Sequence, residues 1–264
     1  MTGGAIIALQ EVAKSFDGGR SSAVDGVSLS VAEGEFLALV GASGSGKTTT
    51  LKMINRLVEP DRGEVLVDGA PARSLSAPEL RRRIGYVFQG IGLFPHLSVA
   101  ENIAITPALM GWRRADADAR TLELLDLVGL PRSYAPRAPA ALSGGERQRV
   151  GVARALAARP KIVLMDEPFG ALDPVTRDGL GQAYRDLHER LGLTTVMVTH
   201  DMQEAILLAD RIAVMGKGSL LAEGTPGELV GASADPQVRA LMDMPRSQAE
   251  RVRARLGQEG GGDG

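Results

Sequence analysis

The sequence predicts an α/β fold in which a parallel sheet is covered by helices on both faces. Short, mostly apolar runs occur at residues 36–40, 161–165 and 195–198. Such runs lack the alternation of half-exposed strands and are typical of parallel strands buried on both sides. A helical stretch, residues 178–191, separates the last two runs. Apolar strands that alternate with helices in this way indicate one doubly covered sheet.

The remaining elements are predicted in chain order around this sheet. Further strands are expected at 5–9, 23–31, 63–69 and 85–88, with turns at 17–19 and 33–34. From about residue 98 to 158 the pattern becomes mostly helical, and Leu122, Leu125 and Val128 share one face. We interpret this helical stretch as an insertion into one α/β domain. A polar, Arg-rich helix follows residue 234, and the glycine-rich segment 260–264 is expected to be disordered.

Residues 41–48 form a complete GxxxxGK[ST] loop between an apolar strand and a helical stretch, 49–54. In that context the motif predicts triphosphate binding, because the glycines let successive N–H groups turn toward phosphate oxygens. Lys47 is expected to reach the β- and γ-phosphates, and the Thr48 hydroxyl to ligate Mg²⁺. The candidate nucleotide-binding residues of this segment are Gly41, Ala42, Ser43, Gly44, Ser45, Gly46, Lys47, Thr48 and Thr49.

Two carboxylates end the apolar run at 162–165. A buried strand can present acids only at its end, where they meet water or a metal. Asp166 therefore fits a Mg²⁺-associated carboxylate. Glu167, one residue further, is expected to face the other side of the chain and to polarise an attacking water.

His200 and Gln89 also follow predicted strands. Open α/β sheets bind their ligands at the carboxyl ends of strands, so a neutral His200 could hold the γ-phosphate or the water. Taken alone, a single histidine is more often incidental. The amide of Gln89 could contact Mg²⁺ or the water, although by itself this residue would carry no weight.

The segment 142–149, Leu-Ser-Gly-Gly-Glu-Arg-Gln-Arg, is a second candidate phosphate-binding motif. It offers the Ser143 hydroxyl and the N–H groups of Gly144 and Gly145, followed by a helix expected to begin near Glu146. One nucleotide has no evident need for two such devices from one chain. This duplication indicates assembly with a second copy.

Composition excludes several classes of function. The formal net charge is −2 with no long basic run, so nucleic acid is not the expected partner; the one compact basic triplet, 81–83, reads as a solvated surface. The chain has no cysteine, which excludes disulfides. No apolar stretch approaches the ~18 residues needed to span a bilayer, and no signal-peptide pattern occurs at the N-terminus.

In their order along the chain, these motifs resemble the ATP-binding subunit of ATP-binding cassette (ABC) transporters over roughly residues 5–226. The matching pieces are GASGSGKTT, Gln89, LSGGERQRV, IVLMDEP, the Ala171-Leu172-Asp173 triplet and His200. The resemblance implies a P-loop NTPase with a RecA-like parallel core, an N-terminal antiparallel β-subdomain and an inserted helical subdomain. The implied ABC domain spans 1–233, with the RecA-like core and the β-subdomain at about 1–89 and 159–233 and the helical subdomain at about 90–158. Residues 234–264 would form a helical extension and tail.

The resemblance also implies an assembly and roles for residues. ATP and Mg²⁺ would be sandwiched in a head-to-tail homodimer, between the 41–49 segment of one copy and residues 143–145 of the other. Phe16 would stack on adenine, Glu167 would be the catalytic base and His200 the switch histidine, with Lys47 and Gln89 completing the catalytic set. Asp166, Thr48 and Gln89 would hold the metal, and Asp173 would lie at the dimer interface.

Several segments look most like importers of quaternary-amine osmoprotectants such as glycine betaine, choline and carnitine; they are 53–60, 89–96, 166–177 and 199–210. In such a system the subunit sits on the cytoplasmic face of the membrane. A permease is expected to insert a coupling helix into the groove beside the helical subdomain, and an extracytoplasmic binding protein to deliver solute. Many members of this group carry paired CBS modules after the cassette, and the 264 residues resemble the version without them.

Three alternatives remain open at this stage. Another importer, for an amino acid, methionine, phosphonate or polyamine, would use the same mechanism. A soluble ABC ATPase acting on ribosomes or DNA would need a second cassette or a long coiled-coil insertion. A non-catalytic subunit would need a broken motif, and each motif is intact.

Overall fold

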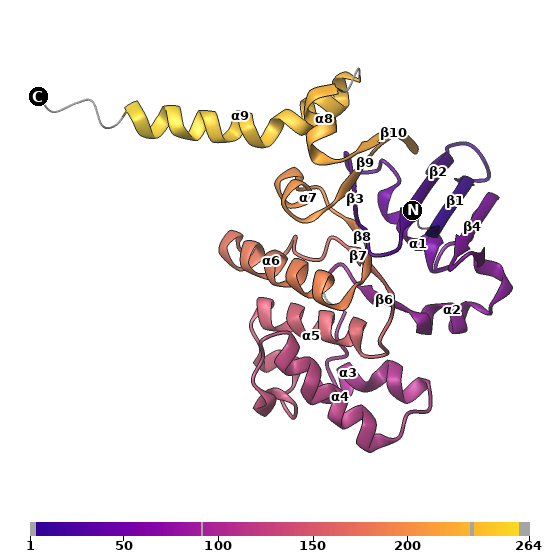
Figure 1. Cartoon of the computed structure of the whole chain (residues 1–264), viewed down its shortest axis with the longest axis vertical. Coiled ribbons are helices and arrows are strands. Elements are labelled where there is room, and N and C mark those ends of the chain that lie inside the picture. Colours follow the sequence, from indigo (N-terminus) through magenta and orange to yellow (C-terminus); the bar gives the residue numbers. More distant parts are fainter. Residues whose placement is uncertain (1–3, 91, 233–234, 259–264) are drawn as a thin grey trace, which may run out of the picture.

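The computed structural model describes residues 4–90, 92–232 and 235–258, and its strands form two sheets (Figure 1). The first sheet is antiparallel, with strand order β2-β1-β4-β5. The second has the order β10-β9-β3-β8-β7-β6; its strands are parallel from β9 to β6, and β10 pairs antiparallel with β9. The strands are β1 (Ala5–Lys14), β2 (Val24–Ala32), β3 (Phe36–Val40), β4 (Arg62–Val67), β5 (Ala70–Pro71), β6 (Ile84–Val87), β7 (Ile162–Asp166), β8 (Thr194–Val198), β9 (Arg211–Gly216) and β10 (Ser219–Gly224).

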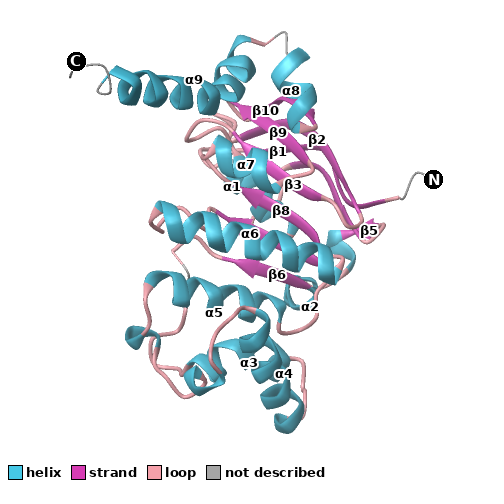
Figure 2. Cartoon of the chain, turned by 60° about the vertical axis from the view of Figure 1, so that its left-hand side comes forward, coloured by secondary structure: helices cyan, strands magenta, loops and turns pink. Residues whose placement is uncertain are grey.

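Helices cover both faces of the parallel sheet and extend beyond its β6 edge (Figure 2). Three of them, α3, α4 and α5, gather into a layer at that end of the molecule, so the predicted helical insertion is present in space. The helices are α1 (Lys47–Ile54), α2 (Ala77–Arg83), α3 (Val99–Leu109), α4 (Arg114–Leu127), α5 (Gly144–Leu156), α6 (Pro174–Leu191), α7 (Met202–Leu208), α8 (Pro226–Ala232) and α9 (Pro236–Gln258). The division of the chain into domains stays a prediction.

The central strands separate two hydrophobic cores because successive side chains point to opposite faces. In β3, Phe36, Ala38 and Val40 belong to the core beneath α5 and α6, whereas Leu37 and Leu39 belong to the core shared with α1 and the antiparallel sheet. Each of these side chains is fully buried. The same alternation along β7 decides which way the acids at its end face.

Helix starts differ slightly from the predicted ones, and capping explains the differences. Helix α5 begins at Gly144 rather than near Glu146, because Ser143 and Glu146 form a reciprocal capping box. Helix α6 begins at Pro174 rather than 178, because the side chain of Asp173 accepts a hydrogen bond from the N–H of Thr176.

The predicted Arg-rich helix is α9, which projects away from the body of the molecule (Figure 1). Val238 and Met242 near its start are buried, whereas Val252 and Leu256 near its end are exposed. The segment 260–264, predicted to be disordered, lies outside the described residues. Within residues 4–90, 92–232 and 235–258, no helix combines the length and apolar character that crossing a bilayer demands.

Candidate nucleotide-binding site

The carboxyl ends of the parallel strands surround a cavity of about 620 Å³. The 41–46 loop follows β3, Gln89 follows β6, Glu167 follows β7 and His200 follows β8. Side chains far apart in the sequence therefore meet at one edge of the sheet, as the strand order requires. The lining residues are Phe16, Ala23, Ser43, Gly44, Ser45, Gly46, Lys47, Thr48, Thr49, Gln89, Glu167 and His200.

The loop has a backbone that only glycine allows at two positions. Gly46 has φ +100°, and a Cβ there would lie 2.4 Å from the carbonyl oxygen of Ala23. Gly41 has φ +142°, and its Cβ would lie 2.1 Å from the carbonyl oxygen of Met215. Because Gly46 is also the N-cap of α1 and supplies no side-chain acceptor, the first N–H groups of that helix stay available to an anion.

Lys47 is held inside this loop and is only 6% exposed. Its Nζ donates to the carbonyl oxygens of Gly41 and Ala42, both at 2.9 Å. Burial lowers the pKa of Lys47, and the negative charges of Glu167 and Asp166 oppose that shift. The loop therefore carries a cation at its centre, where phosphate oxygens could replace the backbone carbonyls as partners.

Asp166 lies beneath the loop, 3% exposed, on the face of β7 that looks toward α1. Its Oδ1 accepts a hydrogen bond of 2.9 Å from the Thr48 hydroxyl. Its Oδ2 lies 3.5 Å from the Tyr86 hydroxyl and 3.9 Å from Lys52 Nζ. Burial raises the pKa of Tyr86, so its hydroxyl keeps its proton and remains a donor.

The donor set at this position fits Mg²⁺. A hydroxyl and one carboxylate are hard oxygen ligands, and Mg²⁺ at nucleotide sites takes one or two carboxylates together with phosphate oxygens and waters. No group of three or more acidic, His or Cys ligands occurs among the described residues.

Glu167 stands at the mouth of the cavity on the other side of β7. Its backbone has φ +46°, and its N–H donates to the carbonyl oxygen of Val198 at 2.9 Å. Gln89 Nε2 donates to Glu167 Oε2 at 3.0 Å, and His200 Nδ1 lies 3.5 Å from the same oxygen. Gln89 and His200 therefore both contact the carboxylate of Glu167. Gln89 lies at Glu167 rather than at Asp166.

Phe16 and Ala23 complete the rim. Phe16 is 66% exposed, and Lys14 Nζ lies 5.6 Å from the centroid of its ring. A flat aromatic ring free on one side is able to stack on a base. Sequence reasoning missed Ala23; the signal for it is tertiary, since its carbonyl oxygen faces the missing side chain of Gly46.

Residues 143–145 do not line this cavity. They begin α5, where Ser143 Oγ accepts from the N–H of Glu146 at 3.3 Å and Glu146 Oε2 accepts from the N–H of Ser143 at 2.7 Å. That backbone hydrogen bond and the Tyr134 hydroxyl lower the pKa of Glu146. A Cβ on Gly145 would approach Thr176 Cγ2 to 2.7 Å, so this turn packs against the start of α6, beside exposed Asp173.

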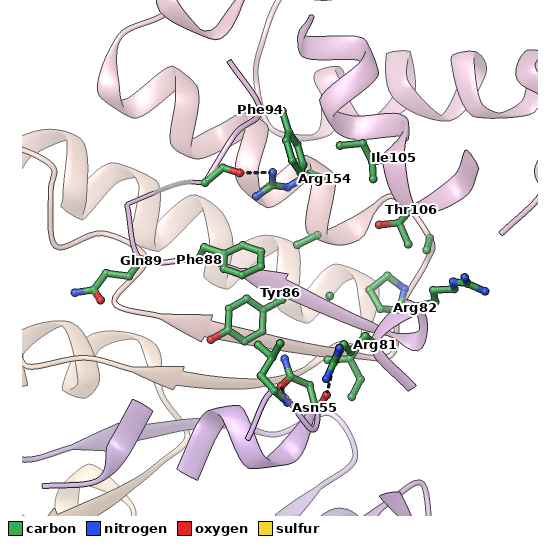
Figure 3. Close-up of a pocket in the computed structure, with 17 residues that line it drawn as sticks. Asn55, Arg81, Arg82, Tyr86, Phe88, Gln89, Phe94, Ile105, Thr106 and Arg154 are labelled. Atoms are coloured by element: carbon green, nitrogen blue, oxygen red, sulfur yellow. Dashed lines mark hydrogen bonds between the residues drawn. The ribbon is translucent and has the colours of Figure 1, made fainter. Parts of the chain in front are cut away.

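A second hollow, of about 440 Å³, lies where β6, α2, α3 and α5 meet (Figure 3). Phe88, Phe94 and Ile105 give it apolar walls, and Arg154 donates to the carbonyl oxygen of Gly92 at 2.7 Å across one end. Gln89 also borders it. The hollow and the nucleotide cavity therefore share Gln89 as a lining residue.

Comparison with known proteins agrees with this geometry. A family model described as "ABC transporter" matches residues 24–170. The choline transport ATP-binding protein OpuBA of Bacillus subtilis is 48% identical over 91% of this chain. The glycine betaine uptake system ATP-binding protein YehX of Escherichia coli is 52% identical over 89% of this chain. The chain spans 63% of the length of the first relative and 75% of the second.

A solved ATP-binding cassette, a dimer in a post-hydrolysis state bound to ADP and Pi, superimposes with a TM-score of 0.74. It is 37% identical, and the match covers 83% of this chain and 98% of the other. The α/β fold, with its parallel and antiparallel sheets, is therefore confirmed. Motifs, fold and relatives agree that the chain belongs to the ABC transporter family.

Proposed function

We propose that this chain is the ATP-hydrolysing subunit of an importer that takes up a quaternary-amine osmoprotectant through a separate permease. The observation that carries the proposal is the convergence of Lys47, Thr48, Glu167 and His200 around one cavity, with Asp166 hydrogen-bonded to Thr48 beneath it. That set holds the parts needed for phosphoryl transfer to water: a phosphate cradle, a metal-side carboxylate and a carboxylate at the mouth.

In this proposal the nucleotide is ATP, stacked on Phe16, and it is bound between two copies of the chain. Residues 41–49 of one copy hold the phosphates, and Ser143 of the partner subunit and the two glycines after it close over them. Two observations support a site shared between two copies. Residues 143–145 do not line the cavity of their own chain, and the solved relative is a dimer. Exposed Asp173, beside that turn, would then face the partner.

The residues divide the chemistry between them. Glu167 accepts a hydrogen bond from water and orients it for in-line attack on the γ-phosphate, while Gln89 and His200 hold the carboxylate and the phosphate in place. Lys47 and Ser143 of the partner subunit offset charge on the phosphate oxygens in the transition state. Thr48 and Asp166, with Gln89 nearby, would hold Mg²⁺, which would supply positive charge beside the phosphates.

The cargo is proposed from the named relatives, whose transport substrates are choline and glycine betaine. A sulfate/thiosulfate import ATP-binding protein of Thermosynechococcus vestitus is 47% identical over 89% of this chain. An importer of another solute is therefore the second candidate. In this proposal the cavity receives only the nucleotide, so none of its residues would select the solute.

The hollow of Figure 3 is the proposed seat of the permease. Its apolar walls suit a short amphipathic helix, and its border at Gln89 links the permease to the hydrolytic carboxylate. The subunit would then sit on the cytoplasmic face of the membrane, and an extracytoplasmic binding protein would deliver solute to the other side.

The test reconstitutes the chain with its permease in vesicles and measures ATP-driven uptake of labelled glycine betaine, choline, carnitine and sulfate. We expect uptake of a quaternary amine, lost in Glu167→Gln. Sulfate uptake alone would overturn the cargo and keep the mechanism. A wild-type chain that hydrolyses no ATP with its permease would overturn the proposal as a whole.

A further inference from the structure

We propose that Arg177 is a positioning residue that fixes His200 relative to Glu167, by bridging the segment after β7 to the turn after β8. The inference rests on the proposed ATPase function, because it assigns Arg177 a part in that same site. Arg177 lies in the first turns of α6 and does not line the nucleotide cavity. Any influence on the reaction must pass through other residues.

One end of the bridge is the segment that follows Glu167. The guanidinium of Arg177 donates to the carbonyl oxygen of Leu172 at 3.1 Å and to that of Gly170 at 3.4 Å. These carbonyls belong to the stretch that leads from Glu167 to Asp173. A planar guanidinium with several donors can hold two such oxygens at once, which an ammonium cannot do with the same geometry.

The other end of the bridge is the turn that carries His200. Arg177 Nη1 forms an ion pair with Asp201 Oδ2 at 3.0 Å. The second oxygen of Asp201 is already committed, since it accepts from the N–H groups of Gln203 and Glu204 at the start of α7. Asp201 is therefore fixed from both sides, one residue after His200.

The two tethered segments lie close to each other at the site. A Cβ added to Gly170 would lie 3.6 Å from His200 Cε1 and 3.9 Å from Glu167 Oε2. The side chain of His200 is 59% exposed, and its 3.5 Å contact with Glu167 is its one polar contact among the residues that the structure describes. The imidazole therefore depends on its backbone for its position, and Arg177 ties that backbone to the segment carrying Glu167.

Loss of the bridge should change rate rather than nucleotide affinity. Without Arg177, the 170–172 segment and the 199–201 turn lose the side-chain link between them and are joined only through the ends of β7 and β8, while the 41–48 loop keeps its contacts. A misplacement of about 1 Å can cost up to ~10²-fold in rate. We expect Arg177→Ala to lower kcat by about 10- to 100-fold and to leave the KM for ATP within about twofold.

The experiment measures steady-state ATP hydrolysis by the chain with its permease for R177A, R177K, D201N and the R177A/D201N double variant. D201N keeps an acceptor for the start of α7 and removes only the charge that pairs with Arg177. We expect D201N and R177K to fall between wild type and R177A. The double variant should be no slower than R177A, because both changes break one connection.

A matched control lies two turns further along the same helix. Arg185 donates to the carbonyl oxygen of Leu208 at 2.8 Å and pairs with Asp210 at 2.7 Å, so it also ties α6 to the far end of α7. R185A should lower the melting temperature as R177A does, yet keep wild-type kcat. This separates a loss of packing from a loss of positioning.

A second readout requires no activity. The imidazole ¹H–¹³C resonances of His200 in the nucleotide-free chain should shift in R177A and stay in place in R185A. Wild-type kcat in R177A, or a rate loss equal to that of R185A with unmoved His200 resonances, overturns the proposal. Absence of hydrolysis in wild type with shifted His200 resonances would instead reject the ATPase function and keep the bridge.

Discussion

The starts of α1 and α5 are both glycine-rich helix N-termini, and they are built in opposite ways. Helix α1 has Gly46 as its N-cap, with no side chain to satisfy its first N–H groups. Helix α5 has Ser143 as its N-cap and a complete capping box with Glu146. Lys47, Asp166 and Glu167 gather around the first, whereas the second lies outside the cavity of its own chain.

The difference teaches how two similar motifs divide one task. An uncapped helix start has donors with no partner, so it gains from an anion. A helix start that is capped by its own side chains is stable without a ligand. It can therefore remain at the surface until the nucleotide of a partner subunit binds. The α1 start is therefore expected to determine affinity and chemistry, and the α5 start to determine closure of the dimer.

The largest effect should come from the carboxylate at the α1 side. Glu167→Gln keeps size and shape but removes the charge that orients water, so we expect hydrolysis to fall by about 10³-fold or more. ATP should still bind, and an ATP-bound dimer should accumulate. Phosphate release and sedimentation with ATP measure both effects, with exposed Glu189→Gln on α6 as control. Turnover at the wild-type rate would remove Glu167 from its role.

The next effect is on affinity. Lys47→Ala removes a buried cation from the phosphate cradle, and a charge-assisted bond of this kind corresponds to roughly 10²-fold in binding. Calorimetric titration of the monomeric chain with an ATP analogue should show this weakening. Unchanged affinity would mean that the α1 start does not hold the triphosphate.

Ser143→Ala should cause a smaller loss of ATP hydrolysis, and it should leave the affinity of a single chain for ATP unchanged. We expect hydrolysis to fall by about tenfold, because one donor to the phosphate is lost from the partner's side. Ser98→Ala is the matched control, since Ser98 and Glu101 form the same capping box at α3. Equal rates for the two variants would argue that Ser143 only caps its helix.

Mixing variants sharpens the comparison further. One copy with Lys47→Ala and one with Ser143→Ala assemble a dimer that has one fully intact composite site. The mixture should hydrolyse ATP faster than the average of the rates that the two variants show separately. If each chain hydrolyses ATP on its own, mixing will give only the average of the separate rates.

The smallest effect concerns stability and pH. Burial raises the pKa of Glu204 to about 7, and the neighbouring Asp201 and Glu167 add to the shift while Thr199 and Arg177 oppose it. The folded chain thus keeps a proton there that the unfolded chain releases near pH 4.5. Stability from this group is present below that value and is lost as pH rises through about 7.

Glu204→Gln should remove this loss of stability at high pH. We expect its melting temperature to exceed that of wild type by a few degrees at pH 8.5, at about 2–4 °C per kcal/mol for a chain of this size. The difference should shrink toward zero at pH 5. Asp186→Asn, at an exposed carboxylate on α6, is the control. A gap of constant size across this range would show that Glu204 does not titrate as described.

The positions of the candidate site residues could be predicted from the sequence because each follows from a local pattern. The 41–48 motif fixes its own turn, and an acid or His after an apolar strand must emerge at the sheet edge, which places Asp166, Glu167 and His200. Contacts between distant segments could not be read in this way. Ala23 under Gly46 and the two tethers of Arg177 depend on how loops pack, which no local pattern records.

The same limit applies to the fold. Apolar runs predicted the strands, but the order β10-β9-β3-β8-β7-β6 depends on which edges meet in space. Start points of α5 and α6 moved by a few residues because Ser143 and Asp173 act as caps. Val238 and Met242 at the base of α9 are buried by tertiary packing, which could not be predicted from an Arg-rich sequence.

The absence of residues 143–145 from their own chain's cavity has a consequence for control. In the proposed dimer, hydrolysis needs an encounter of two copies, so for free subunits its rate would rise with the square of their concentration. A permease that holds both copies replaces that encounter with a high effective concentration. Subunits that are not bound to a permease would then hydrolyse little ATP, and hydrolysis would occur mainly where solute can be transported.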